Sequence, residues 1–242
     1  MTFITAFKKF RDLQDQIQLS ALYSWQVNDI AVVTAINEIG QREKLSSYPN
    51  VKLVQGVRTG RDLGFSTGAV VIKDLLLKGL LATETQLVAL VKGDVIIPPD
   101  FNARVKKIVD MFGYDIFLIG HRRSIQTAYC ADSPDTYKRL CGEPHTQERE
   151  PNLFLTSRFM MRKLAIQMPE FIFGRFYWDT WIHQWAVQNV HKIMDCTDTL
   201  PTYHCVHPMN HIYQAEGAHG TEADSAKYNK GLIDGFSSCL LR

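Results

Sequence analysis

Residues 86–97 read QLVALVKGDVII, and this stretch decides the expected fold. The run from Gln86 to Val91 is apolar, which is typical of a strand that is buried on both faces of a parallel sheet. It stops at Lys92-Gly93-Asp94, where charged residues and a glycine end the apolar pattern. We therefore expect these three residues to lie just beyond the carboxyl end of a central strand.

Strand and helix patterns alternate on both sides of this stretch. Short apolar runs predict strands at residues 3–7, 29–35, 51–54, 86–91, 115–119, 152–156 and 192–195. Apolar residues at steps of three and four predict helices at residues 10–25, 69–81, 159–167 and 178–189, and a helix capped by Asp100. This alternation predicts an α/β fold with a central, mainly parallel sheet flanked by helices.

The length of 242 residues suits one large domain or two small ones. We find no repeat, low-complexity tract or convincing linker, so we expect a single domain over residues 1–242. Residues 129–151 combine two cysteines, three prolines and many charges, which predicts a long irregular segment. The tail after Gly217 is polar and rich in glycine.

Charge and composition exclude several classes of function. The 27 Lys and Arg residues face 25 Asp and Glu residues, and a net charge of +2 gives no electrostatic case for binding nucleic acid or an anionic membrane. The chain has no apolar run of about 18 residues or more, so we expect no transmembrane segment. The first ten residues lack a secretory signal, and five cysteines are an odd number that fits free thiols. We expect a cytoplasmic protein.

Ligands of open α/β sheets bind beyond the carboxyl ends of the strands. Three places satisfy this rule: the loop after Phe7, the loop after Ala35, and Lys92-Gly93-Asp94. The Asp94 carboxylate is well placed there to hold a divalent cation on a diphosphate. The alternative is an ordinary turn aspartate ahead of a Pro-Pro corner.

Several histidines gather late in the chain, at positions 204, 207, 211 and 219. His204 and His207 have a spacing that a metal site can use, although scattered surface histidines are common. A zinc site that adds Cys196 and Cys205 competes with this interpretation, but its spacing is not a recognised zinc pattern.

The segment Trp178-Asp179-x-Trp181 places two indoles and a carboxylate at the start of an expected helix. In a structural role, Asp179 complements the helix dipole and both indoles are core residues. In a functional role, the indoles form a platform for a sugar ring beside a general base. Arg58 and Arg61 lie in a glycine-containing loop, where they either hold phosphate or are solvated; the loop matches neither a dinucleotide fingerprint nor a P-loop.

The segment Met168-Pro169-x-Phe171-x-x-Gly174-Arg175-x-x-Trp178-Asp179-x-Trp181, followed by His204-x-x-His207, resembles a small group of stand-alone GT-A glycosyltransferases. In that group, the M-P-x-F-x-x-G-R-x-x-W-D-x-W block and a downstream His pair occur together. Tyr228-Asn229-Lys230-Gly231-Leu232 is similar to the N-x-x-L ending of the group. The resemblance covers nearly the whole chain, and the W-D block is its specific part.

This resemblance implies a GT-A fold and transfer of a sugar from a nucleotide-sugar donor. The donor would bind the half formed by about residues 1–120, at Thr5, Ala6, Phe7, Arg58, Arg61, Lys92, Gly93 and Asp94. Mn²⁺ or Mg²⁺ would bridge the diphosphate to Asp94, which matches the last acid of a D-x-D motif, with His204 or His207 as a further ligand.

The half formed by about residues 121–242 would then hold the acceptor and the histidine ligand of the metal. The resemblance implies that Asp179 is the base that activates a hydroxyl of a glycan or another acceptor, with inversion at the anomeric carbon. Arg175, Trp178 and Trp181 would contact the acceptor.

The chain departs from the group at the metal site. Lys92 stands where a D-x-D motif has its first acid, and this lysine could itself carry part of the phosphate charge. Cys205 and Pro208 replace the residues that usually follow the two histidines. These departures allow a second hypothesis, a degenerate GT-A domain that binds a nucleotide sugar without turning it over. A sugar nucleotidyltransferase, which needs a glycine-rich segment after the first strand, and a zinc hydrolase rank lower.

Overall fold

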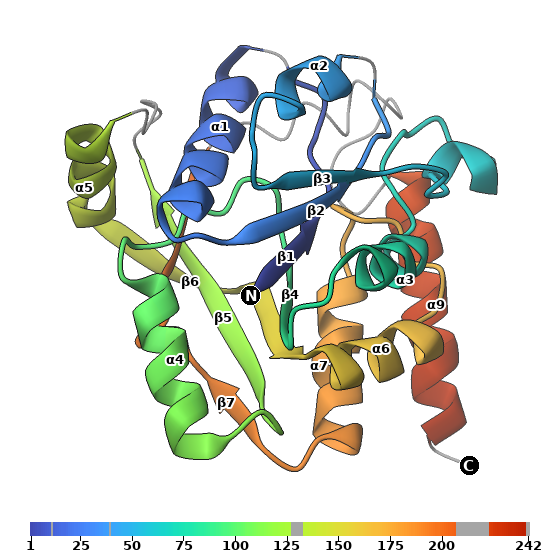
Figure 1. The fold of residues 1–242 in the computed structure, drawn as a ribbon. Helices are drawn as coiled ribbons and strands as arrows, with labels where there is room; N and C mark the ends of the chain where they lie inside the picture. Colours follow the sequence, from blue (N-terminus) through green and yellow to red (C-terminus); the bar gives the residue numbers. More distant parts are fainter. Residues whose placement is uncertain (11, 39, 127–132, 207–222, 241–242) are drawn as a thin grey trace.

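The computed structural model describes residues 1–242 except residues 11, 39, 127–132, 207–222 and 241–242. Within the described residues, the centre of the fold is an eight-stranded sheet with helices on both faces (Figure 1). The strands are β1 (Thr2–Thr5), β2 (Ala31–Ala35), β3 (Val51–Val54), β4 (Leu87–Val91), β5 (Phe117–Ile125), β6 (His145–Ser157), β7 (Ile193–Asp195) and β8 (Thr202–Cys205). The helices are α1 (Asp12–Val27), α2 (Gln41–Leu45), η1 (Gly60–Leu63), α3 (Ile72–Ala82), α4 (Phe101–Phe112), α5 (Pro134–Gly142), α6 (Arg158–Gln167), α7 (Trp178–Asn189) and α9 (Asp224–Leu240).

The strand order is β3-β2-β1-β4-β6-β5-β7, and β8 also pairs with β5. Strands β1 to β4 are mutually parallel where they pair, and β6 is antiparallel to both of its neighbours. Strands β7 and β8 run parallel to β5 and pair with successive parts of it. The sheet is therefore mixed but mainly parallel, as the alternating sequence pattern predicts.

Side chains that alternate along each strand divide the interior into two cores. Phe3 packs in one core and Ile4 in the other, because neighbouring side chains of a strand point to opposite faces. Helices α1, α4 and α5 cover the first core, whereas α3, α6, α7 and α9 cover the second (Figure 1). Burial on both faces explains why β4 is apolar at every position.

The predicted strands and helices are largely confirmed, but two predictions are wrong: that residues 129–151 form an irregular segment, and that Asp100 caps a helix. Residues 129–151 are not one irregular segment: α5 and the first half of β6 lie within them, and residues 127–132 lie outside the described part. The polar tail contains a long helix, α9, whose Asn229 and Ile233 are buried against the second core. Asp100 precedes α4 as expected, but its carboxylate contacts Arg104 at 2.8 Å and makes no capping hydrogen bond.

No helix in the described part of the chain is long and apolar enough to cross a membrane.

Candidate functional site

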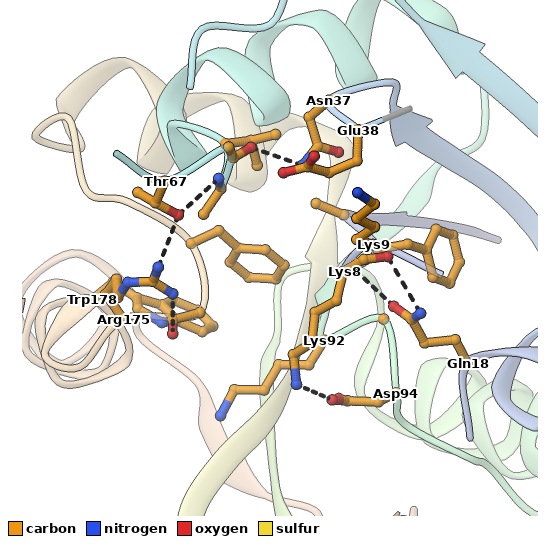
Figure 2. Close-up of a pocket in the computed structure, with 18 of the residues that line it drawn as sticks. Lys8, Lys9, Gln18, Asn37, Glu38, Thr67, Lys92, Asp94, Arg175 and Trp178 are labelled. Atoms are coloured by element: carbon orange, nitrogen blue, oxygen red, sulfur yellow. Dashed lines mark hydrogen bonds and ion pairs between the residues drawn. The ribbon is translucent and has the colours of Figure 1, made fainter. Parts of the chain in front are cut away.

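A cleft of about 780 Å³ opens at the carboxyl ends of β1, β2 and β4 (Figure 2). The chain leaves β1 for β2 on one side and later returns to β4 on the other, so the cleft lies where the strand order reverses. The three loops that the sequence singles out all line it, through residues 6–9, residues 37–38 and residues 92–94.

Gly93 allows the turn after β4 to approach β1. A Cβ atom at this position would lie 2.7 Å from the carbonyl oxygen of Ala6 and 3.0 Å from the Phe7 ring. Only a glycine fits so close to the backbone that follows β1. The absence of a side chain at Gly93 therefore keeps Asp94 beside the loop that follows β1.

Asp94 is buried and contacts two groups from distant parts of the chain. The Nζ atom of Lys8 lies 2.8 Å from Oδ2 of Asp94, and Nε2 of His204 lies 3.6 Å from the same oxygen. His204 reaches this position because Tyr203 pairs with Ile96 through two backbone hydrogen bonds of 2.8 and 2.9 Å. Burial lowers the pKa of His204, although the Asp94 carboxylate opposes the shift, so the imidazole is neutral at neutral pH.

These residues only partly fit the expected metal site. Mg²⁺ usually takes one or two carboxylates together with substrate phosphates, and Asp94 with His204 would be two protein donors. However, the ammonium of Lys8 lies on the Asp94 oxygen that faces His204. No group of three or more His, Cys, Asp or Glu side chains that could hold a metal occurs among the described residues, and His207 lies outside them. The described residues therefore do not form a resident metal site.

Lys92 points across the cleft to the opposite wall. Its ammonium contacts the carboxylate of Glu150 and lies 5.8 Å from the ring centroid of Trp178. Arg122 contacts the other oxygen of Glu150 at 2.9 Å and also Glu148 at 2.6 Å. Burial by itself would raise the pKa of Glu150, but Lys92 and Arg122 outweigh it and hold this pKa below its ordinary value. Glu150 is therefore an ionised partner of two cations.

Asp179 lies at the start of α7, next to this ion-pair cluster. Tyr177, just before the helix, has a φ of 81°, a left-handed conformation that is costly for an aromatic residue. One carboxylate oxygen of Asp179 accepts a hydrogen bond of 2.9 Å from the backbone N–H of Thr180. Burial raises the pKa of Asp179, although the positive charge of Lys92 opposes the shift. The neighbouring carboxylates of Asp179 and Glu150 thus have pKa values shifted in opposite directions, up for Asp179 and down for Glu150.

A second hollow of about 560 Å³ begins where the cleft ends. Its lining includes His121, Phe176, Tyr177 and His183, and it shares Glu150, Phe176 and Asp179 with the cleft. Asp179 therefore lines both spaces.

The other residues of the W-D block divide between the cleft and the core. Arg175 lines the cleft, but its buried guanidinium donates to Thr67 at 2.8 Å (Figure 2). The guanidinium also donates to Ser225 at 2.7 Å, which joins α9 to the rest of the site. Trp178 also lines the cleft. Trp181 does not line it; this indole is buried and packs 6.0 Å from the ring of Phe171.

Of the eight predicted donor-binding residues, six line the cleft: Ala6, Phe7, Arg61, Lys92, Gly93 and Asp94. Thr5 does not, because it is fully buried within β1. Arg58 does not either; it forms ion pairs with Asp74 at 2.7 Å and Glu170 at 2.6 Å outside the cleft.

The competing zinc interpretation finds no support in the described residues. Cys196 and Cys205 are buried in the first apolar core, and burial raises the pKa of Cys196 to about 12, which disfavours the thiolate that zinc requires. His211 and His219 lie outside the described part of the chain.

Sequence analysis misses several polar residues of the cleft, including Lys8, Gln18, Thr67, Arg122 and Glu150. Lys8 begins the loop after Phe7 that the rule for strand ends singles out, but the predicted donor contacts near this loop stop at Phe7. Arg122 and Glu150 could not be found in this way, because β5 and β6 extend beyond their apolar parts into polar sequence.

No family model matches this chain, and no curated protein sequence matches it. Solved structures do match its fold. Residues 1–349 of TarS from S. aureus give a TM-score of 0.54 at 16% identity, over 84% of this chain and 60% of the TarS chain. The same fragment in complex with UDP-GlcNAc gives a TM-score of 0.54 at 14% identity, over 86% of this chain and 58% of the TarS chain. GalNAc-T7 with UDP, GalNAc and Mn²⁺ gives a TM-score of 0.55 at 13% identity, over 86% of this chain and 43% of the GalNAc-T7 chain.

At these identities the likeness shows the fold: a central mixed sheet flanked by helices, as in GT-A glycosyltransferases. The chain spans less than two thirds of the length of each of these matched chains.

Proposed function

We propose that this protein transfers a sugar from a nucleoside diphosphate sugar to an acceptor hydroxyl. The GT-A-like fold and the position of the cleft at the switch point of the sheet support a nucleotide-sugar donor. The UDP-GlcNAc in the TarS complex and the UDP in the GalNAc-T7 complex are donors or donor products of this class. The cleft also has a volume in the range of about 300–1,000 Å³ that is usual for small-molecule sites.

The charges of the cleft suit a diphosphate. Cationic side chains outnumber the carboxylates around it and come from both halves of the chain: Lys8, Lys9, Arg61, Lys92, Arg122 and Arg175, against Glu38, Asp94, Glu150 and Asp179. A partly enclosed, cationic cleft favours phosphate groups, because charge interactions strengthen where water is excluded. Phe7, Phe173 and Trp178 add aromatic surface for a base or a sugar ring.

The position of Asp179 is the observation that carries the proposal. This residue lines both the cleft, where we place the donor, and the second hollow, where we place the acceptor. An acceptor hydroxyl that enters from the hollow would give its proton to Asp179 while its oxygen bonds to the anomeric carbon. The electron pair of the broken carbon–oxygen bond would leave with the nucleoside diphosphate. Attack from the side opposite the leaving group inverts the anomeric centre.

The raised pKa of Asp179 supports the role of a general base. A base works best when its pKa approaches the working pH, and burial moves this carboxyl in that direction. The ion-paired Glu150 is held anionic by Lys92 and Arg122, so it is the poorer proton acceptor of the two.

The expected acceptor contacts need revision. We propose that Trp178 lies beside the transferred sugar and that Phe176, Tyr177 and His183 in the second hollow contact a glycan or another hydroxyl acceptor. Arg175 would act by holding the site together rather than by touching the acceptor, because Thr67 and Ser225 accept its hydrogen bonds.

The Lys8–Asp94 contact favours a second candidate function. If this ammonium only neutralises Asp94, the cleft lacks the expected Mn²⁺ or Mg²⁺ site and the protein is a binding module that holds a nucleotide sugar without turnover. Donor binding without release of nucleoside diphosphate in the presence of any acceptor would favour the binding module over the transferase.

A thermal-shift panel of UDP-, GDP- and dTDP-sugars tests the proposed function. A ligand at ten times its dissociation constant stabilises the folded protein by about 1.4 kcal/mol, which is readily measured as a rise in melting temperature. We expect a rise with the sugars of one nucleotide and none with the free sugars. A panel without any shift would refute the donor site.

A further inference from the structure

We propose that Lys8 is a built-in cation that binds the donor diphosphate, at the place where the resemblance to GT-A enzymes puts a divalent metal. This inference rests on the proposed function, and it explains why the described residues do not form a resident metal site. Donor binding by this protein should then be independent of Mn²⁺ and Mg²⁺.

The contacts of Asp94 point to this role. The carboxylate that would bridge a metal to the diphosphate holds the Lys8 ammonium at 2.8 Å instead (Figure 2). A divalent cation on the same oxygen would lie within a few ångströms of the Lys8 charge and would be repelled by it. An ammonium carries three N–H donors, so Lys8 can keep its contact with Asp94 while it donates to a phosphate oxygen.

The loop that carries Lys8 is fixed before any ligand binds. The backbone N–H of Lys8 donates to Oε1 of Gln18 at 2.6 Å, and Nε2 of Gln18 donates to the Lys8 carbonyl at 3.3 Å. Gln41 donates to the carbonyl of Phe7 at 2.9 Å. Both glutamine side chains belong to buried residues, at 1% and 0% exposure. This support fixes the backbone of the loop at the carboxyl end of β1, so less of it has to be ordered when the ligand binds.

Lys8 also differs from the other cations of the cleft in its partner. Lys92 and Arg122 both contact Glu150 on the opposite wall, and Arg61 lies 3.5 Å from Glu38 at the exposed edge. Lys8 alone among these four contacts the carboxylate that matches the metal-binding acid of a D-x-D motif. Among these four cations, Lys8 therefore lies where the resemblance implies a divalent cation.

Calorimetric titration of the whole protein with UDP, GDP and dTDP, in EDTA and in Mn²⁺, tests this inference. The wild type should bind one of these nucleotides equally well in both buffers. Lys8→Met should weaken that binding by about 10- to 100-fold in EDTA, the usual effect of losing one charged hydrogen bond. The same substitution should weaken binding of the corresponding nucleoside monophosphate much less. Lys106→Met, on the exposed face of α4, is the matched lysine control and should bind as the wild type does.

Mn²⁺ provides the sharper test of the same variant. With the ammonium removed, Asp94 and His204 become accessible to a dication, so Mn²⁺ should partly restore binding to Lys8→Met but not to Lys8→Met combined with Asp94→Asn. Lys8→Arg, which keeps the charge, should retain metal-independent binding and shows that the loop tolerates substitution. The melting temperature without ligand checks that each variant is folded.

Two results would overturn the inference while leaving the proposed function intact. One is wild-type binding that disappears in EDTA, and the other is a folded Lys8→Met protein that binds the diphosphate normally in EDTA. A wild type that binds none of the three nucleotides in either buffer would instead remove the proposed function, and the inference with it.

Discussion

Replacing Gly93 with alanine would add one methyl group where the turn after β4 passes closest to β1. The new Cβ would lie 2.7 Å from the carbonyl oxygen of Ala6. Carbon and carbonyl oxygen atoms normally stay at least about 3.3 Å apart, so the turn would have to retreat by roughly 0.6 Å. The obstacle is backbone in the residue that directly follows β1, and a backbone carbonyl cannot rotate away as a flexible side chain can.

The size of the effect follows from the cost of overpacking. Inserting a methyl group into a well-packed site usually costs about 1–3 kcal/mol. In a protein of this size, each kcal/mol corresponds to about 2–4 °C in melting temperature, so Gly93→Ala should melt roughly 2–12 °C below the wild type. Nucleotide binding should weaken as well, because Lys92 and Asp94 move with the turn.

Thermal unfolding followed by circular dichroism measures this change, with Gly231→Ala as the control. A Cβ at Gly231 in α9 meets nothing within 4 Å. Alanine there should raise the stability by up to about 1 kcal/mol, because glycine is the poorer helix former. A Gly93→Ala protein that melts at or above the wild-type temperature would refute the close-approach argument.

Three further predictions concern the site and its supports. Asn229→Ala should lower the free energy of unfolding by roughly 2–4 kcal/mol in urea titrations, because Ile172 and Phe176 lose three hydrogen bonds to this buried amide; an unchanged midpoint would contradict it. Arg175→Lys should lower the free energy of unfolding by roughly 1–3 kcal/mol in the same assay, since an ammonium cannot reproduce the fork geometry of a guanidinium. A variant as stable as the wild type would argue against the buried contacts of Arg175. The transfer rate should fall with decreasing pH as Asp179 protonates, at a pH above that of an ordinary aspartate because burial raises its pKa; a rate that rises toward acid pH would exclude it as the base.

The first half of the fold is predictable because β1, β2 and β4 are almost entirely buried on both faces. Runs such as residues 86–91 are apolar throughout, and the loops that follow them are polar. Parallel strands point their carboxyl ends to one edge, so the rule for strand ends places three separate loops around one cleft. The second half is harder to predict, because β5 and β6 continue from buried apolar residues into polar residues that are partly exposed.

Strand β6 illustrates this limit. Its last residues are mainly apolar, and their pattern predicts a strand. Residues 145–150 are polar, and the part of them that pairs with the extension of β5 is exposed at the edge of the site. A polar strand of this kind has no apolar pattern to reveal it. Ion pairs between distant segments are equally hidden: Arg58 is 112 residues from Glu170, and Lys8 is 86 residues from Asp94.

The central claim is that Asp179 takes the acceptor proton while the donor lies in the adjacent cleft. The direct test compares wild type and Asp179→Asn for release of nucleoside diphosphate from the nucleotide sugar that binds, across a panel of acceptor glycans. Asparagine keeps the oxygen that accepts the Thr180 N–H, so folding and donor affinity should be unchanged. The rate should fall by about 10²- to 10⁴-fold, the usual contribution of a general base, whereas Asp110→Asn on the exposed face of α4 should act as the wild type does. An Asp179→Asn protein that transfers sugar at the wild-type rate would contradict the account.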